Sequence, residues 1–321
     1  MDLSFTPDQD ALREAARRLY AKESHGERVR EAEVAGHDPA LWQGAVQMGL
    51  PTMAVPAEHG GAGASLTDLA AAVEVHGAHV GTIPLVETAV VARLLARLTE
   101  ADDTAAPWLV RLVDGASAAL CLHRGATADT GSLTAYAAVA DLVVAMGPGG
   151  LVAIEGPVVP ARRTLSGLAV AEVRAGSGSP IGGAAGEPAF AAALDEWRAL
   201  TAIAQAGLAR SSLDLGLQYA KDRHQFGVPI GSFQVLQHRF ADLHTRVEGA
   251  RLLAYEALWA LDMGDPTAPM RAAQASWACG EAAEGATGFS LHVHGGYGFM
   301  LEYDVQLHVR RAKATRLLLG D

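Results

Sequence analysis

The chain has 321 residues, of which 50% are hydrophobic, 19% charged and 6% aromatic, which allows one to three domains and excludes a disordered chain. Its 25 Lys and Arg against 36 Asp and Glu give a net charge of −11, which argues against nucleic acid or an anionic membrane as the main partner. Two cysteines, no signal peptide and no run of 18 apolar residues lead us to expect a cytoplasmic protein without disulfides or a membrane span.

The first part of the chain, residues 1–105, is predicted to be helical. Thr6, Pro7 and Gln9 are typical of a helix N-terminus, in which Thr6 caps the helix and Gln9 completes a capping box. A second helix is predicted to begin at Asp38-Pro39 and to end near Gly49, and two more cover residues 65–78 and 83–98. The glycine-rich segment 55–63 between them is predicted to be a loop.

Residues 106–186 change to short apolar runs separated by Gly, Asp and Pro, a pattern typical of strands. The runs cover 118–122, 133–139, 141–146 and 151–154. We therefore expect a small β-sheet or barrel domain that ends in a glycine-rich linker over 174–186. Residues 176–182 in that linker are similar to a dinucleotide-binding GxGxxG, but they have one residue too many and lack the strand and helix that the motif requires.

Residues 187–321 return to helical periodicity and are predicted to form a helical bundle. Apolar or small side chains recur at alternating steps of four and three, as in a helix packed lengthwise against its neighbours. This seam consists of Leu236, Phe240, Leu243, Val247, Ala250, Ala254, Ala257 and Leu261. The chain as a whole is therefore expected to be mainly α, with a small β domain in the middle.

Residues 223–234, with two glycines and a proline, interrupt the bundle pattern and mark a bend between two helices. An arginine followed by polar and aromatic side chains at such a bend is suited to bind a phosphate and to stack on a base. The alternative is a simple turn in which Arg223 caps a helix C-terminus, and spacing alone favours that alternative.

Residues 292–298 form a second interruption, with clustered glycines that allow positive φ and expose backbone N–H groups. Such a segment can form an anion-binding nest, or it can be a helix C-cap followed by a tight turn. His292 and His294 have no third ligand at a convincing spacing, so we expect no metal site.

Taken together, these segments resemble the acyl-CoA dehydrogenase family. The strongest match is carried by RHQFGVPIGSFQVLQ at 223–237 and HVHGGYGFMLEYD at 292–304, with Ala241-Asp242 between them and Arg310-Arg311-Ala312-Lys313 after them. The N-terminal half agrees more loosely, through VPAEHGGAG at 55–63, Asp68, Glu74, Gly77 and Ile83-Pro84. The resemblance implies a C-terminal four-helix bundle, FAD at a subunit interface and α,β-desaturation of an acyl-CoA.

The resemblance also implies which residues meet the FAD. In the family these two segments reach across to an FAD that is bound mainly by a neighbouring subunit. Arg223 and Gln225 would contact its pyrophosphate, and His292 stands where the family usually has Gln. The residues implied at the adenine end and the ADP moiety are Phe226, Ile230, Phe233, Gln234, Gly295 and Gly296.

The catalytic base of the family has no clear counterpart here. Desaturation needs a carboxylate that takes the α-proton while hydride leaves for the flavin. Leu319 stands at the position where most members have this Glu. Other members place this Glu directly before an Arg at the start of the bundle, where this chain has Trp197. Glu196 lies one residue earlier, and on a helix that offset turns the side chain by about 100° away from the Trp197 position. We therefore assign no catalytic residue and expect Glu196 to be a surface carboxylate.

The middle of the chain departs from the family as well. Nothing between residues 106 and 174 is similar to its isoalloxazine-binding loop or strand, and the chain ends at Asp321, before the family's last flavin contacts. This combination resembles the smaller (β) subunit of actinobacterial α2β2 acyl-CoA dehydrogenases that act on CoA thioesters of sterol side chains. The resemblance then implies a larger homologous subunit that supplies the flavin pocket and the catalytic Glu.

Two other hypotheses stay open on the sequence. The chain could be a homo-oligomeric dehydrogenase whose base is Asp195 or Glu196, and it would then bind flavin alone. It could also be a degenerate member that binds acyl-CoA or a partner without catalysis, and it would then bind no flavin.

Overall fold

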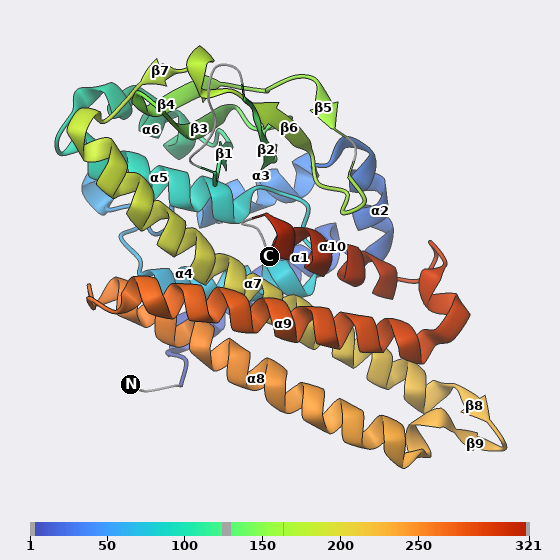
Figure 1. Cartoon of the computed structure of the whole chain (residues 1–321). Coiled ribbons are helices and arrows are strands. Elements are labelled where there is room, and N and C mark those ends of the chain that lie inside the picture. The colour runs from blue at the N-terminus through green and yellow to red at the C-terminus, as the bar shows by residue number, and fades with distance from the viewer. Residues whose placement is uncertain (1–3, 124–129, 163, 319–321) are drawn as a thin grey trace.

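The computed structural model describes residues 4–123, 130–162 and 164–318 (Figure 1). The N-terminal helices are α1 (Pro7–Glu23), α2 (Gly26–Ala35), α3 (Pro39–Gln47), α4 (Leu66–Ala78), α5 (Leu85–Thr99) and α6 (Ala106–Val113). The predicted capping box at Thr6 and Gln9 is confirmed at α1, and Asp38 caps α3 with its carboxylate. Helix α2 was not predicted; its N-cap residue, His25, makes no capping hydrogen bond through its side chain.

The middle segment forms two small sheets. One contains β1 (Ala118–Leu120), β3 (Leu142–Gly147), β4 (Gly150–Glu155) and β7 (Ser179–Pro180) in the order β1-β3-β4-β7, with β1 and β3 parallel. The other is antiparallel, in the order β2-β6-β5, with β2 (Ser132–Ala135), β5 (Ala161–Arg162) and β6 (Val170–Val173). The mixed pairing places the apolar residues of β3 opposite those of β4, with Val144 facing Ala153.

Three details of the middle segment differ from the sequence pattern. Residues 106–113 form helix α6, which packs on α5. The predicted strand 133–139 ends at Ala135, because Tyr136 has φ +61 and begins a turn closed by a hydrogen bond from the Val139 N–H to its carbonyl. The predicted linker 174–186 is ordered, since β7 pairs with β4 and the short 3-10 turns Ala175–Ser177 and Gly183–Ala185 flank it.

The C-terminal part is the expected four-helix bundle. It consists of α7 (Gly186–Asp222), α8 (Gln234–Asp262), α9 (Ala268–His294) and α10 (Val305–Leu317). The predicted seam of α8 faces inward, with Leu243, Val247, Ala250, Ala254 and Ala257 buried. In Figure 1, α7 crosses the middle of the molecule, with the sheets on one side and α8 and α9 on the other.

Helix α4 joins the N-terminal helices to the bundle. It packs against α1, α7 and α8, and Leu66 to Gly77 are all partly or fully buried. One continuous hydrophobic core therefore runs through the helices and one face of the larger sheet, while a smaller core fills the space between the two sheets. The domain limits 1–105, 106–186 and 187–321 stay a prediction. No helix within the described ranges is both long and apolar enough to cross a membrane.

Candidate functional site

The bend predicted between α7 and α8 is a β-hairpin that projects beyond the end of the bundle (Figure 1). Strands β8 (His224–Gln225) and β9 (Val228–Pro229) pair, and Phe226 and Gly227 form the two-residue turn with φ +54 and +81. Positive φ at both positions is the geometry of tight hairpins, and it is uncommon for a residue other than Gly, Asn or Asp. The turn presents the Phe226 side chain outward, 93% exposed.

Arg223 brings the two predicted segments together. It is the C-cap residue of α7, and its backbone N–H donates to the carbonyl of Tyr219. Its guanidinium carbon lies 5.9 Å from the ring centroid of Tyr297 in the second segment. Within the described ranges Arg223 forms no ion pair, so its charge is available to an anion. The backbone of Arg223 therefore caps the C-terminus of α7, as the alternative interpretation expects. Its guanidinium lies beside Tyr297 and forms no ion pair with the described residues.

The second segment, residues 292–298, starts in the last turn of α9, which ends at His294. Gly295 has φ +59 and ψ −137, a conformation that favours glycine, and residues 295–299 form a 3-10 turn. Gly295 and Gly296 are exposed, with no atom within 4 Å of an added Cβ, so their backbone can be approached closely. His294 is buried and stacks on Tyr219 at 4.2 Å, which gives it a structural role.

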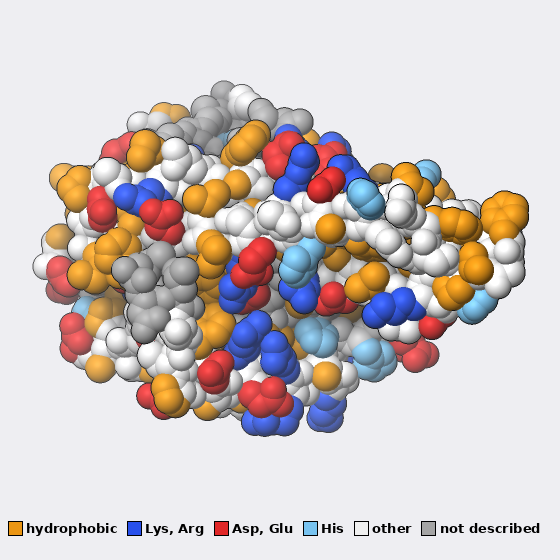
Figure 2. Space-filling model, turned by 90° about the horizontal axis from the view of Figure 1, so that it is seen from below, with side chains coloured by type: hydrophobic (Ala, Val, Ile, Leu, Met, Phe, Trp, Pro, Cys, Tyr) orange, Lys and Arg blue, Asp and Glu red, His pale blue; other side chains and the backbone are white. Residues whose placement is uncertain are grey.

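An open groove of about 700 Å³ lies between the start of α8 and the end of α9. Gln234, which is predicted at the adenine end, and His292, which stands where the family usually has a Gln that contacts phosphate, both line this groove. His238 and Arg239 line it too and were not predicted, although their i+4 spacing from Gln234 and Val235 places them on the same faces of α8. Figure 2 shows hydrophobic side chains gathered on the projecting end of the molecule, with Lys, Arg and His side chains behind them.

The remaining predicted residues lie on the hairpin and the turn that follows it. Gln225 donates to the carbonyl of His224, Ile230 is half-buried at the start of the 3-10 turn Ile230–Ser232, and the Phe233 ring lies 6.3 Å from that of Phe226. All the residues predicted to meet FAD therefore lie at one end of the bundle. Among residues 4–123, 130–162 and 164–318, no group of three His, Cys, Asp or Glu is placed to hold a metal.

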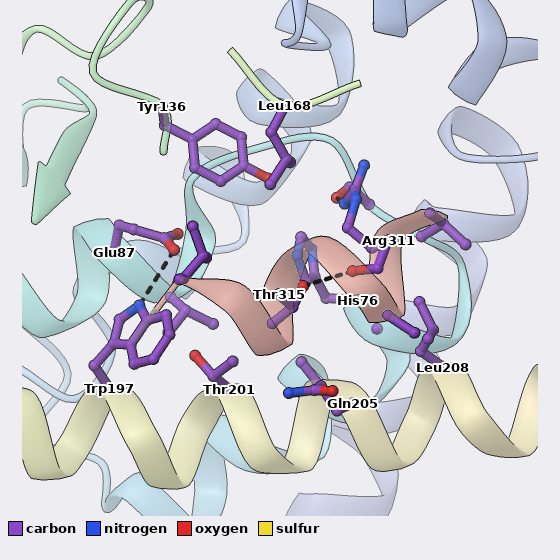
Figure 3. Close-up of a pocket in the computed structure, with 17 residues that line it drawn as sticks. His76, Glu87, Tyr136, Leu168, Trp197, Thr201, Gln205, Leu208, Arg311 and Thr315 are labelled. Carbon is purple, nitrogen blue, oxygen red and sulfur yellow. Dashed lines mark hydrogen bonds between the residues drawn. The ribbon is translucent and has the colours of Figure 1, made fainter. Parts of the chain in front are cut away.

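A second, smaller and partly open chamber lies where α4 and α5 face α7 and α10 (Figure 3). Its walls include His76, Glu87, Tyr136, Trp197 and Arg311, and the space between them measures about 60 Å³. A space of this size suits a few water molecules and is too small for an acyl chain. The side chain of Tyr136, held at positive φ, closes the side toward the sheets.

Several polar groups of the chamber form hydrogen bonds, while Oε1 of Gln205 and Nε of Arg311 have no partner among the described residues. The Trp197 indole N–H donates to the Glu87 carboxyl at 3.3 Å, and burial raises the pKa of Glu87. Arg311 donates to the carbonyl of Gly81 and the hydroxyl of Thr82. Burial, assisted by the charge of Arg311, lowers the pKa of His76 to about 3, so this ring is neutral near pH 7.

Glu196 was expected to be a surface carboxylate, and this expectation is wrong. Its side chain is 2% exposed, accepts hydrogen bonds from Arg93 at 2.9 and 3.1 Å, and also pairs with Arg97. The turn of the helix between adjacent residues directs Glu196 toward α5 and Trp197 into the chamber. Asp195 pairs with Arg198 at 2.7 Å, and Leu319 lies outside the described residues.

Two family models match the chain. Residues 6–116 match "Acyl-CoA dehydrogenase, N-terminal domain", and residues 185–321 match "Acyl-CoA dehydrogenase, C-terminal domain". The chain is also 32% identical over 320 residues to the acyl-CoA dehydrogenase IpdE2 of Mycolicibacterium smegmatis, which covers 98% of this chain and 96% of that protein.

Solved structures are similar over almost the whole chain. A variant of the steroid ACAD Tcur3481-Tcur3483 has a TM-score of 0.86 at 26% identity, covering 97% of this chain and 93% of that one. Butyryl-CoA dehydrogenase from Megasphaera elsdenii has a TM-score of 0.85 at 23% identity, covering 100% and 96%, and supports the fold.

Proposed function

Because the chain belongs to the acyl-CoA dehydrogenase family of FAD-dependent oxidoreductases acting on CH–CH groups, we propose that it supplies half of a shared FAD site. In this proposal it provides the ADP end of the site to a larger, homologous subunit in an α2β2 assembly. That subunit would hold the flavin ring and the carboxylate that removes the α-proton. The substrate would be an acyl-CoA with a bulky group such as a sterol side chain.

The observation that carries this proposal is the contrast between the two sites. The projecting end of the bundle offers the guanidinium of Arg223, which forms no ion pair with the described residues, an exposed ring at Phe226 and open backbone at Gly295. The chamber inside the chain measures about 60 Å³, and Glu196 is paired with Arg93 and Arg97. The side chains at the projecting end are thus suited to bind a cofactor. The interior is not suited to desaturate an acyl chain, because the chamber is small and Glu196 is held in ion pairs.

The residues at the projecting end fit the ADP part of FAD. A guanidinium binds phosphate oxygens through paired donors, an aromatic ring can stack on adenine, and exposed glycine N–H groups can approach an anion. The groove with Gln234 and His292 has room for an adenosine group. FAD, when bound, supplies the acceptor for the hydride that leaves the acyl-CoA. The part of this chain is to bind and orient the ADP end.

The names of the relatives support the choice of partner and substrate. The solved structure named for Tcur3481 and Tcur3483 together is called a steroid ACAD, and it is 26% identical to this chain. A homo-oligomer with Glu196 as its base is less well supported, because Glu196 already forms ion pairs with two arginines and does not line the chamber.

The first test is the flavin absorbance per chain, measured for the protein purified alone and co-expressed with a larger homologue encoded beside it. We expect a colourless chain alone and a yellow complex with about one FAD per pair of subunits. A yellow chain alone would contradict the proposal in favour of the homo-oligomer. A colourless complex would favour the non-catalytic alternative.

Arg223→Ala in the complex should weaken FAD retention on the order of tenfold while the subunits stay associated, because a charge-assisted phosphate contact is lost. Arg246→Ala is the matched control, since Arg246 is also exposed, lies on α8 outside the groove, and has no ion pair in the part of the chain that is described. Full flavin occupancy in Arg223→Ala would refute the assignment.

A further inference from the structure

We propose that Arg30 on α2 is a positioning residue for this FAD half-site, an inference that rests on the proposed function. Arg30 lies more than 250 positions before the segment that it holds, and nothing in the sequence pattern connects the two. Its role is to fix the loop 295–304, called here the glycine loop, so that Tyr297 stays beside Arg223.

Arg30 binds the C-terminal part of the glycine loop at three points. Its Nε donates to the carbonyl of Leu301 at 2.5 Å, and its Nη2 donates to the carbonyl of Glu302 at 2.7 Å and the carboxylate of Asp304 at 2.6 Å. A planar guanidinium with donors in a fixed fork restrains the direction of all three acceptors at once. The end of the loop is therefore tied to the N-terminal helices.

Gly26, the first residue of α2, is an independent sign of the same contact. A Cβ added at Gly26 would lie 1.9 Å from Oδ1 of Asp304, so any larger residue would push the carboxylate away. The absence of a side chain lets Asp304 approach the N-terminus of α2, where negative charge is favoured. Asp304 thus lies close against Gly26 on one side and is bound by Arg30 on the other.

The glycine loop is packed at Gly298 and Tyr303 and exposed at its tip. Phe299 and Leu301 are 76% and 70% exposed. Two glycines at its start add conformational freedom that must be restrained for binding. The hydrogen bonds from Arg30 to residues 301–304, called here the clamp, therefore restrain the loop in addition to the buried Gly298 and the contact of Tyr303 with His294.

A chain of contacts leads from the clamp to the cofactor residues. Tyr303 lies between Glu302 and Asp304, both of which Arg30 holds, and its ring centroid is 5.5 Å from that of Tyr297. The Met300 N–H donates to the carbonyl of Tyr297, which closes the turn between them. Tyr297 in turn lies 5.9 Å from the guanidinium of Arg223. Release of the clamp should therefore shift Tyr297 and loosen Arg223.

The test compares Arg30→Ala, Arg30→Lys and Arg310→Ala in the FAD-loaded complex. Arg310 is the matched control, because it also joins α10 to α2 through Glu33, has a similar side-chain exposure of 25% against 27%, and does not contact the glycine loop. We expect FAD release, followed by flavin fluorescence, to become about tenfold faster in Arg30→Ala and to stay near the wild-type rate in Arg310→Ala. Arg30→Lys should lie between them, since lysine keeps the charge and loses the fork.

Hydrogen exchange of amides 296–304 in the isolated chain provides a readout that needs no flavin. Exchange should rise in Arg30→Ala and not in Arg310→Ala. Equal FAD release from both variants, or unchanged exchange in Arg30→Ala, would overturn the positioning role. Raised exchange in Arg30→Ala together with full FAD retention in Arg223→Ala would uphold the clamp on the loop and contradict the proposed function.

Discussion

Glu87 and Glu196 are both buried, but their surroundings differ. Two arginines, Arg93 and Arg97, form ion pairs with Glu196. Glu87 has one neutral donor, the indole of Trp197, and burial raises its pKa. At the residue scale, therefore, the acidic side chain nearest to the family's base position serves as a structural ion-pair partner, whereas the carboxyl that lines the chamber has a raised pKa.

Replacing Glu196 by Gln should destabilise the chain by about 2 kcal/mol and leave the activity of a complex with its partner nearly intact. The change leaves Arg93 and Arg97 partly buried without a counter-ion, which is costly, although their partial exposure reduces the cost. Urea unfolding of the isolated chain measures the first effect. Glu14→Gln, which removes two exposed helical pairs with Arg17 and Arg18, should cost less than about 0.5 kcal/mol. A loss of activity by several orders of magnitude would instead make Glu196 the base.

At the scale of elements, α4 is the helix on which the N-terminal part and the bundle meet. A side chain from another helix satisfies backbone donors at the N-terminus of α4: Asp262 at the end of α8 accepts hydrogen bonds from the backbone N–H groups of Leu66 and Thr67 at 2.8 and 3.0 Å. Farther along, Glu74 on α4 binds Arg251 and Tyr255 on α8. A carboxylate at the C-terminus of its own helix is unfavourable, so the position of Asp262 is explained by its contact with α4.

Asp262→Ala should lower the free energy of unfolding by about 1 kcal/mol, the usual effect of removing a helix N-cap. The loss is measured by urea or thermal unfolding, and we expect the N-terminal turn of α4 to exchange its amide hydrogens faster. Asp214→Ala removes an exposed i,i+4 pair with Arg210 and serves as the control, with little change expected. Equal stability of the two variants would show that Asp262 does not act as a cap from another helix.

At the scale of the whole molecule, several histidines are held neutral by burial. His76 and His308 are buried where α4 and α7 meet α10, and His37 and His79 are partly buried nearby. Burial lowers the pKa of each of the four, to about 3 for His76. In the unfolded chain these rings titrate near their ordinary value of about 6.5, so the unfolded state binds more protons below that pH.

The free energy of unfolding should therefore fall as the pH falls from 7.5 to 5, by roughly 1 kcal/mol or more. The stabilisation is complete above about pH 6.5 and is lost progressively below it. The raised pKa of Glu87 acts in the opposite sense above about pH 4.5, but it is one group against four. Urea unfolding at several pH values measures the slope, which His76→Gln should reduce. A stability that is independent of pH over this range would contradict the prediction.

The local rules of the chain predicted most of the fold. Thr6, Asp38 and Ser65 lie where capping chemistry places a helix N-terminus, and the apolar seam of α8 faces the core as its periodicity requires. These features depend on residues within one or two helical turns, so they can be recognised without knowledge of the fold. The middle segment was predicted less well, because its shortest strands, β5 and β7, have two residues each and exist only through their pairing.

The sequence by itself determined the family and the helical architecture, and it singled out the two segments that we propose to meet FAD, because those features are carried by contiguous residues. Only the tertiary structure decided that Arg223 faces Tyr297, that Glu196 is buried between two arginines, and that Arg30 holds the glycine loop. These contacts join residues that lie 74, 99 to 103 and 271 to 274 positions apart. The physical reason is that burial and ion pairing are set by whichever distant elements pack around a side chain, and local sequence spacing carries no information about them.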